Sequence, residues 1–160
     1  MPANASFWSR MRPLGGMRCR VLSCLGADNP KLASFFDPPP GSALEEELRS
    51  YLERLHEAEE DPTVRRIAAA GLLTLGELRY ADEIIRGLPQ TPIRLDHGAG
   101  WCPLLPYSLA AELLPLPEAL TNAKTWIAGT AIEADLMRWF EAHRERLVWD
   151  PAAERFVRAS

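Results

Sequence analysis

From residue 42 onward, apolar side chains recur at the three- and four-residue spacing of amphipathic helices. The first such stretch opens on a capping box, Ser42-Ala43-Leu44-Glu45, in which the Ser and Glu side chains can satisfy each other's backbone N–H groups. Its apolar positions are Leu44, Leu48, Tyr51, Leu52 and Leu55. The pattern predicts an amphipathic helix of about four turns, with its charged residues, Arg49 among them, mostly facing solvent.

Residues 61–88 hold the most regular pattern in the chain. Asp61 can cap a helix, and Pro62 suits the first helical position because its missing N–H has no partner there. The apolar and small positions that continue one face are Val64, Ile67, Ala68, Gly71, Leu72 and Leu75. Gly76 is placed to end this helix. A second helix carries Ala81, Ile84, Ile85 and Leu88 and stops at Pro89. The stretch predicts an antiparallel helical hairpin, and its small residues allow a neighbouring helix to approach closely.

The remaining chain predicts less regular helices. A long connection rich in Pro and Gly covers residues 89–103, and Pro103 then opens a helix that Pro115 ends. Another helix is indicated by Leu120, Ala123 and Ile127. A second capping box, residues 130–133, starts a last long helix. Its inner face is expected to carry Ile132, Leu136, Trp139, Phe140, His143 and Leu147. Residues 147–160 predict a brief extended pair around Asp150-Pro151 that lays Trp149 and Phe156 over the end of the bundle.

The first 41 residues predict an irregular basic segment ahead of a helical domain over residues 42–160. Residues 1–27 contain four Arg and no acid, and one short helix or strand is possible near Met17–Leu25. No apolar run of signal-peptide length follows these arginines, and no segment approaches the ~20 apolar residues of a membrane span. Three Cys, an odd count without framework spacing, fit a reducing compartment. We therefore expect a cytoplasmic protein that does not bind membranes.

Residues 61–88 resemble a HEAT repeat of the bacterial type. The residues that carry the resemblance are Asp61, Pro62, Val64, Arg65, Ala68, Ala69, Leu72, Leu75, Gly76, Ala81, Ile84 and Leu88. The resemblance implies that the small and aliphatic positions pack helix on helix. It also implies that Asp61 and Arg65 join neighbouring repeats through side-chain hydrogen bonds. Residues 130–157 are similar, more loosely, to the Trp-bearing helix and short Trp-Asp and Phe segment that end some bacterial HEAT proteins.

This resemblance implies an all-α fold of HEAT-like antiparallel helical hairpins in a short, irregular α-solenoid or bundle. Residues 89–130 depart from the repeat pattern. A repeat needs about three or more copies to bury its faces, so irregular helices and caps, or a partner, are expected to complete the core.

Two sets of residues are candidates for chemistry. Cys19, Cys24, His97 and Cys102 have the side chains of a zinc site, but their spacings are wider than usual for zinc ligands, so no cofactor is expected and zinc is the alternative. The loop from Asp96 to Cys102 offers His97 as a general base and Cys102 as a nucleophile. It contains no identifiable third group to orient them, which favours a structural or recognition loop over a catalytic one.

These observations favour a protein-protein interaction module, a scaffold or adaptor without intrinsic catalysis, with a protein partner or a second copy of the chain as its ligand. Candidate partner-binding residues are Arg65, Arg66, Asp96, His97 and Trp101. The alternative is a small enzyme or lyase-like protein that uses the His97–Cys102 loop, as the resemblance to HEAT-like phycobilin lyases suggests. A net charge of −4 argues against nucleic acid as a partner, and with it against HEAT-like DNA-repair proteins.

Overall fold

The computed structural model describes residues 18, 21–22, 38–86, 106–121 and 131–160. Its elements are α4 (Ala43–Ala58), α5 (Pro62–Leu73), η1 (Leu78–Tyr80), α6 (Ala81–Ile85), α7 (Pro106–Leu113), α8 (Glu118–Thr121), α10 (Ala131–His143), η2 (Arg144–Arg146), β1 (Leu147–Asp150) and β2 (Arg155–Arg158). Arg18, Val21 and Leu22 are helical as well. The described residues are mostly helical, as predicted. No helix among them is long and apolar enough to cross a membrane.

Helix α4 begins where the capping signal predicts. The Ser42 hydroxyl accepts a hydrogen bond from the Glu45 N–H at 3.3 Å. In a full capping box the Ser42 N–H would donate to the Glu45 side chain. Here the Ser42 N–H donates instead to the Pro39 carbonyl at 3.0 Å. Leu48 and Leu52 are fully buried, whereas Leu44, predicted on the same face, is 39% exposed. The first turn of α4 therefore lies partly beyond the core that its next turns cover.

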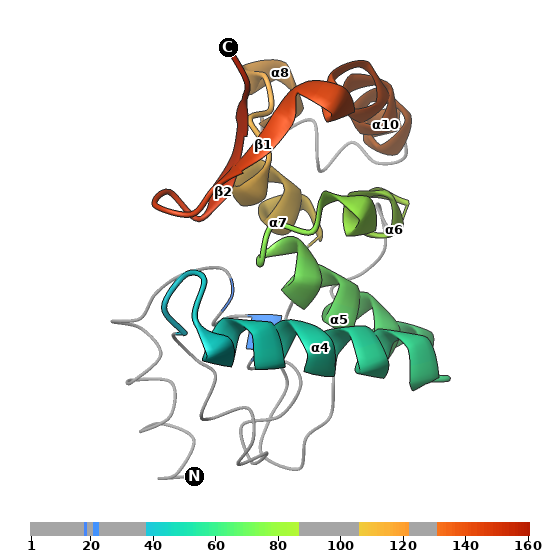
Figure 1. Ribbon diagram of the computed structural model, residues 1–160. Coiled ribbons are helices and arrows are strands. Elements are labelled where there is room, and N and C mark those ends of the chain that lie inside the picture. Colours follow the sequence, from blue (N-terminus) through green and yellow to red (C-terminus); the bar gives the residue numbers. More distant parts are fainter. Residues whose placement is uncertain (1–17, 19–20, 23–37, 87–105, 122–130) are drawn as a thin grey trace, which may run out of the picture.

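Helices α4 and α5 pack against each other along their length (Figure 1). Ala68, Ala69 and Ala70 are fully buried, as their small size predicts. At Gly71 the approach is closest, since a Cβ built there would lie 2.9 Å from Leu52 Cδ1. A glycine at this position thus lets the two backbones approach closely.

A Schellman turn ends α5. The Glu77 N–H donates to the Leu72 carbonyl and the Gly76 N–H to the Leu73 carbonyl, both at 3.1 Å. Gly76 has a φ of +93°, a conformation that residues with a Cβ rarely adopt. The predicted helix end is confirmed. The same glycine touches the C-terminal hairpin, because an added Cβ would lie 2.7 Å from Trp149 Cγ.

The elements after α5 follow the prediction in outline. Helix α6 begins at Ala81 after the 3-10 turn η1, and it buries Ala81, Ile84 and Ile85 as predicted. Helix α7 is described from Pro106, and it buries Ala110 and Leu113. The predicted ends at Leu88 and Pro89, the start at Pro103, and the continuation of α8 through Ala123 and Ile127 lie outside the described residues.

The last helix is shorter than predicted. Helix α10 ends at His143 and η2 follows. Leu147, which the sequence places both on this helix and at the start of the extended pair, begins β1. Leu147 is nevertheless buried, because it pairs with Arg158 in the antiparallel hairpin and joins the core from a strand. Helical spacing alone does not show that the helix has ended before Leu147, since a strand that follows directly can bring a side chain into the same core.

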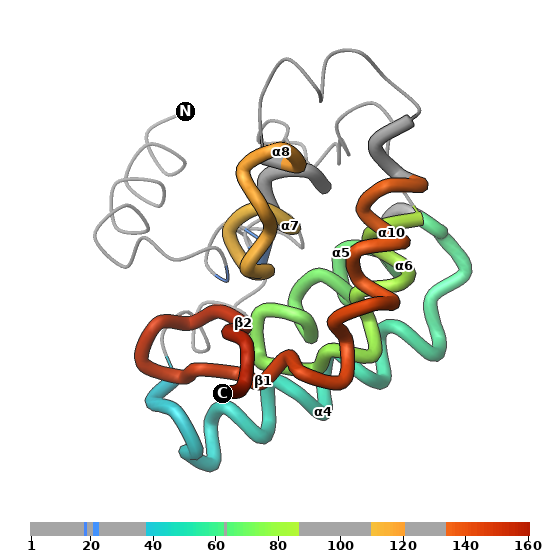
Figure 2. The backbone as a smooth tube through the Cα atoms, turned by 90° about the horizontal axis from the view of Figure 1, so that it is seen from above, coloured from blue at the N-terminus to red at the C-terminus, as the bar shows by residue number. Residues whose placement is uncertain are grey.

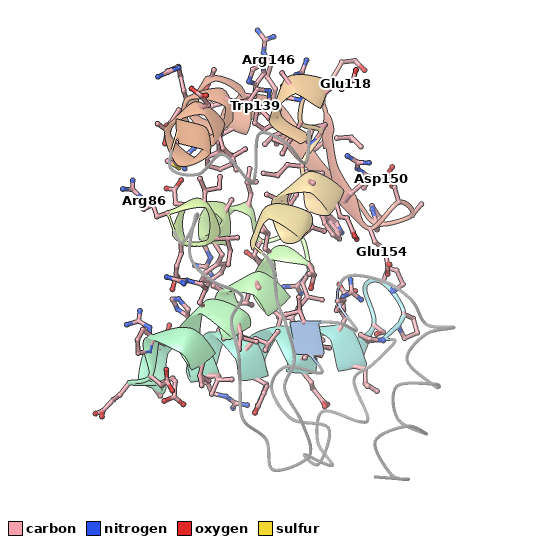
Figure 3. All side chains as sticks on the ribbon, turned by 180° about the vertical axis from the view of Figure 1, so that it is seen from behind. Arg86, Glu118, Trp139, Arg146, Asp150 and Glu154 are labelled. Carbon is pink, nitrogen blue, oxygen red and sulfur yellow. The ribbon has the colours of Figure 1, made fainter. Side chains whose placement is uncertain are left out.

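The C-terminal hairpin has the predicted form. Trp149 pairs with Phe156, and their rings meet edge to face at 5.0 Å between centroids. Asp150 Oδ1 accepts hydrogen bonds from the Ala152 and Ala153 N–H groups at 2.9 and 3.2 Å, which fixes the turn. Figure 3 labels Asp150 and Glu154 on the two sides of this turn. Phe156 is almost completely buried, so the hairpin covers the core with its aromatic face.

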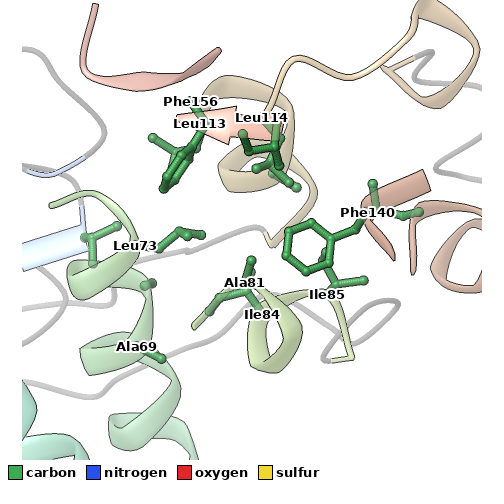
Figure 4. Close-up of a cluster of buried hydrophobic side chains, with 14 of the residues drawn as sticks. Ala69, Leu73, Ala81, Ile84, Ile85, Leu113, Leu114, Phe140 and Phe156 are labelled. Carbon is green, nitrogen blue, oxygen red and sulfur yellow. The ribbon is translucent and has the colours of Figure 1, made fainter. Parts of the chain in front are cut away.

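The buried side chains form two clusters, and α5 contributes to both. The larger cluster joins α5, α6, α7, α10 and the hairpin (Figure 4). The smaller one comprises Leu22, Leu48, Leu52, Leu72 and Leu75. Figure 1 shows α4 low in the view and α10 with β1 high in it, and Figure 2 shows the same elements from above. Helix α5 thus packs against α4 in the smaller cluster and against the later elements in the larger one.

Candidate functional site

The carboxyl end of α5 gathers charged side chains from two other segments. Arg49, on α4, donates from Nη2 to the Leu75 carbonyl at 3.4 Å. Arg18, far earlier in the chain, donates from Nη2 to the Thr74 carbonyl at 3.1 Å. Unpaired carbonyls at a helix C-terminus carry partial negative charge and favour cations. Two guanidinium groups therefore meet two consecutive carbonyls, and we call this arrangement the α5 cap.

Arg49 is one of the charged residues of α4 that the pattern expects mostly on the solvent side, and the structure shows it partly buried. Its side chain is 20% exposed and forms ion pairs with three carboxylates. These are Glu46 at 2.7 Å, Glu77 at 3.1 Å and Glu45 at 3.4 Å. Burial acts to lower the pKa of Arg49, but the hydrogen bond to Glu46 and the charges of all three glutamates outweigh it and raise the pKa. The helix end and these carboxylates hold the guanidinium close to the protein surface and out of bulk water.

Arg18 is more deeply buried than Arg49, at 7% exposure. Within the described residues its guanidinium has one hydrogen bond, to Thr74, and no ion pair. Its Nε is buried without a hydrogen-bond partner. A buried donor without an acceptor costs about 1–3 kcal/mol. Arg18 therefore binds the end of α5 through Nη2, while its Nε makes no hydrogen bond.

The neighbours of Arg18 enter both hydrophobic clusters. Leu22 is fully buried with Leu48 and Leu52 of α4 and with Leu72 and Leu75 at the end of α5. We call these four partners of Leu22 the α4–α5 seam. Val21 is also fully buried, but it belongs to the larger cluster. Arg18 and Leu22 thus both reach the carboxyl end of α5, and Figure 3 draws the short blue helical piece of the N-terminal segment in front of α4.

A second group of polar side chains joins α4 to η1 and α6, and we call it the α4–α6 joint. Its members are Glu53, His56, Arg79, Tyr80 and Glu83. His56 Nε2 lies 2.7 Å from Glu83 Oε2, and Arg79 Nη2 lies 2.8 Å from Glu53 Oε1. The Tyr80 ring meets the His56 ring edge to face at 5.1 Å, and the Arg79 guanidinium lies over Tyr80 at 4.9 Å.

The joint resembles an acid–base pair in its composition, since a carboxylate can orient a histidine for proton transfer. Its geometry favours a structural role. Burial raises the pKa of Tyr80, and the nearby carboxylates of Glu53, Glu77 and Glu57 raise it further against the opposing charge of Arg79. Tyr80 thus stays protonated at neutral pH. All five side chains take part in contacts that hold α4 against η1 and α6.

Two of the predicted site residues are described. Arg65 and Arg66 lie in the first half of α5, where Arg65 is exposed and Arg66 is partly buried. They are consecutive on a helix and therefore lie on different faces. The structure keeps them apart from the α5 cap, which forms at the other end of the same helix.

The other predicted site residues lie outside the described ranges. These are Cys19, Cys24, Asp96, His97, Trp101 and Cys102. The zinc alternative and the reactive-loop alternative therefore stay predictions. In the part of the chain that is described, no three His, Cys, Asp or Glu residues are grouped so that they could hold a metal ion.

Sequence reasoning missed the residues of the α5 cap and of the joint. The sequence shows Arg18 only as one of four arginines in a basic segment and indicates no role for His56. One signal was present: Arg18, Val21 and Leu22 have the spacing i, i+3 and i+4 of a single helical face. The residues on both sides of this short run interrupt the helical pattern, so the spacing does not stand out in the sequence.

Comparisons of the chain with protein-family models, with curated proteins and with solved structures find no match. The HEAT-like character of residues 61–88 thus remains a prediction, and function is inferred from the chain's own residues.

Proposed function

We propose that this chain is a protein-protein interaction module, a scaffold or adaptor of HEAT-like helical pairs that acts in the cytoplasm without catalysis. The observation that carries the proposal is the α4–α5 seam together with the α5 cap. There, α4 and α5 bury the side chain of Leu22, which lies 26 residues before Leu48 in the chain. The Thr74 carbonyl at the end of α5 binds Arg18.

This combination is the chemistry by which proteins bind amphipathic helices. Apolar anchors of the ligand helix enter a surface between packed helices, and a charged residue at its edge sets the orientation. Here Leu22 is the anchor and Arg18 is the charged residue. A chain that presents such a surface to its own segment is equipped to bind proteins.

The HEAT-like part of the proposal is supported by the local structure of α5. Pro62 occupies the first helical position, the buried alanines allow close packing, and Gly76 ends the helix in a Schellman turn. We further propose that exposed Arg65 lies on the partner-facing surface, with Arg66 beside it, and that the partner is a protein or a second copy of the chain.

Affinity purification of the full chain from its host, followed by mass spectrometry and size-exclusion chromatography with light scattering, tests the proposal. We expect a partner in fixed stoichiometry that is lost with Arg65→Glu. It should be kept with Arg54→Glu, because Arg54 is an exposed arginine on α4 that serves as the matched control. A strictly monomeric chain with no partner in fixed stoichiometry would contradict the proposal.

A further inference from the structure

We propose that the outer edge of β1 is a self-association surface, at which β1 pairs antiparallel with β1 of a second copy of the chain around a two-fold axis at Val148. The two hairpins then form one four-stranded antiparallel sheet. This surface is separate from the α4–α5 seam and from Arg65, so the proposal goes beyond the proposed function and does not depend on it.

The backbone of β1 has hydrogen-bonding groups that face away from β2. The Ala159 N–H donates to the Arg146 carbonyl at 2.7 Å, which shows that the backbone of Arg146 faces β2. Facing and non-facing residues alternate along an antiparallel strand, so the backbone groups of Leu147 and Trp149 point to the other side. The Leu147 N–H donates to the Arg144 carbonyl. Within the described residues, the Leu147 carbonyl and both backbone groups of Trp149 have no backbone partner, so they can bond a further strand.

The edge of β1 is more accessible than the edge of β2. Strand β2 packs against α7, and Arg155 Nη2 donates to the Leu114 carbonyl, just after α7, at 3.2 Å. Figure 2 shows β2 on the side of α7 and β1 on the other side of the hairpin. Val148 of β1 is 46% exposed, the most exposed large apolar side chain in the described part of the protein. An open strand edge with an exposed aliphatic side chain readily pairs with another strand.

The side chains of β1 make its edge complementary to itself. Alternate residues of a strand share a face, so Arg146, Val148 and Asp150 follow one another on the outer face as a cation, an aliphatic group and an anion. In the proposed register Val148 of one copy lies opposite Val148 of the other. Each Arg146 then lies opposite Asp150 of the second copy. Opposite charges and β-branched side chains that face each other across two strands stabilise a sheet.

The backbone fits the same register. When Val148 lies on the axis, Leu147 of one copy is opposite Trp149 of the other, and these are the residues whose free backbone groups point outward. The Trp149 N–H of each copy can therefore donate to the Leu147 carbonyl of the other. A shift by one residue would remove both this bonding and the match of charges, so the two requirements select one register.

Both charges of β1 are available for this contact. Arg146 is exposed, and Figure 3 shows its side chain pointing away from the helices. Asp150 uses Oδ1 to accept hydrogen bonds from the turn, which leaves Oδ2 for a guanidinium. Within the described residues neither side chain has an ion pair.

Strand β2 lacks this complementarity. The matching self-pairing of β2 is centred on Val157. In it Arg155 lies opposite Ala159 of the other copy, and Arg158 lies opposite Phe156. Neither arginine has an acid opposite to it, so charge selects β1 as the pairing strand.

Disulfide cross-linking tests the register. In the full chain with its three cysteines replaced by Ser, Val148→Cys places two thiols at a non-hydrogen-bonded pair. The Cα atoms of such a pair are about 4.5 Å apart, within the range of a disulfide. The control is Val157→Cys on β2, which lies three strand spacings, about 14 Å, from its copy. After mild oxidation we expect at least about 10-fold more covalent dimer from Val148→Cys than from Val157→Cys.

Sedimentation velocity of the chain with its native cysteines measures association without a cross-link. The edge is short, so the dimer should dissociate on dilution. Arg146→Glu sets an acid opposite Asp150 and should weaken association at least about 10-fold. Arg158→Glu, at an exposed arginine of β2, changes the net charge equally and should stay within about twofold of the wild type. Asp150→Asn keeps the Oδ1 acceptor of the turn and removes the charge, so it should also weaken association.

Three results would overturn the proposal. The first is a folded wild-type chain that stays monomeric at its highest soluble concentration. The second is preferential cross-linking of Val157→Cys, which would move the contact to β2. The third is equal weakening by Arg146→Glu and Arg158→Glu. Circular dichroism checks that each variant is folded, and the charge variants decide alone if the chain without cysteines does not fold.

The β1 surface and the proposed function fail separately. Arg65 lies on α5 and not on the hairpin, so the dimer should persist in Arg65→Glu. A chain that captures a host partner through Arg65 but does not dimerise contradicts the β1 surface alone. A chain that dimerises through β1 but has no partner that depends on Arg65 contradicts the proposed function alone.

Discussion

Replacing Gly76 by Ala should destabilise the protein through two separable effects. Gly76 has a φ of +93°, where a Cβ meets the backbone, and the same Cβ would lie 2.7 Å from Trp149 Cγ. The two nearest further atoms, Cδ1 and Cδ2 of Trp149, would both lie at 3.0 Å. An indole ring that pairs edge to face with Phe156 has little freedom to move away. The hairpin must therefore shift, or the turn after α5 must open.

Gly41 provides a matched control for the size of the second effect. It has a φ of +75°, and a Cβ added there meets nothing within 4 Å. Gly41→Ala thus costs only the conformational strain, about 1–2 kcal/mol. Gly76→Ala adds overpacking against Trp149, which costs about 1–3 kcal/mol more. The difference between the two variants isolates the contact between the turn and the hairpin.

Urea unfolding followed by circular dichroism measures both free energies. The Trp149→Ala background removes the obstructing ring, so in it Gly76→Ala should cost no more than Gly41→Ala does. A coupling of about 1–3 kcal/mol between positions 76 and 149 completes the cycle. Equal losses for the two glycine variants in the wild-type background, or a loss at Gly76 that persists without Trp149, would refute this reasoning.

Three further perturbations have defined outcomes. Ser42→Ala should lose about 1 kcal/mol of unfolding free energy and Ser42→Asp almost none, because only the first removes the cap of α4; equal losses would show that the hydroxyl is not the cap. Arg49→Met should lose about 1.5–3 kcal/mol, because it removes the ion pairs of Glu45 and Glu46, leaves Glu77 with Arg79 alone and removes a hydrogen bond to the Leu75 carbonyl. Arg54→Met, at an exposed site, should stay within about 0.5 kcal/mol, and similar urea midpoints for the two would contradict the α5 cap. Burial raises the pKa of Tyr80, so its contribution to stability is complete below the ordinary tyrosine pKa and is lost as the pH rises through the raised one. Tyr80→Phe should therefore lose less unfolding free energy than the wild type as the pH rises above about 10, the ordinary pKa of tyrosine, and parallel pH profiles would argue against this reasoning.

The features that sequence predicted correctly are those set by neighbouring residues. Ser42 and Pro62 mark helix starts, Gly76 marks a helix end, and the Asp150 turn joins two extended segments. Each depends on backbone hydrogen bonds or dihedral angles within a few residues. Such signals survive in a single sequence because no distant partner is needed to produce them.

The features that escaped prediction depend on distant residues. Arg49 faces the end of α5, and nothing in the sequence of α4 shows that Leu75 and Glu77 will lie beside it. His56 meets Glu83 in the same way, 27 positions along the chain. Leu147 fits both patterns, the inner face of the last helix and the start of the extended pair, and only the structure decides that it belongs to the strand.

The candidate site was the hardest part to predict from sequence. Arg18, Val21 and Leu22 form too short a run for periodicity to reveal a helix, and Gly15-Gly16 precedes it closely. Their significance depends on the seam, which exists only once α4 and α5 have packed. The sequence favours Arg65 and Arg66 of α5, whose charge is visible in it, over buried Arg18, whose role depends on tertiary structure.

Val21 and Leu22 are adjacent in the chain yet belong to different hydrophobic clusters. Leu72 and Leu73 of α5 are divided in the same way, and Tyr80 packs partly against both clusters. Helix α4 buries its leucines only in the smaller cluster, where Leu22 is one of five buried residues. Leu22→Ser should therefore let α4 open before the rest of the molecule. Amide hydrogen exchange should then divide into a fast class on α4 and a slow class on α6 and α10. Cooperativity of unfolding thus reports whether Leu22 is in place.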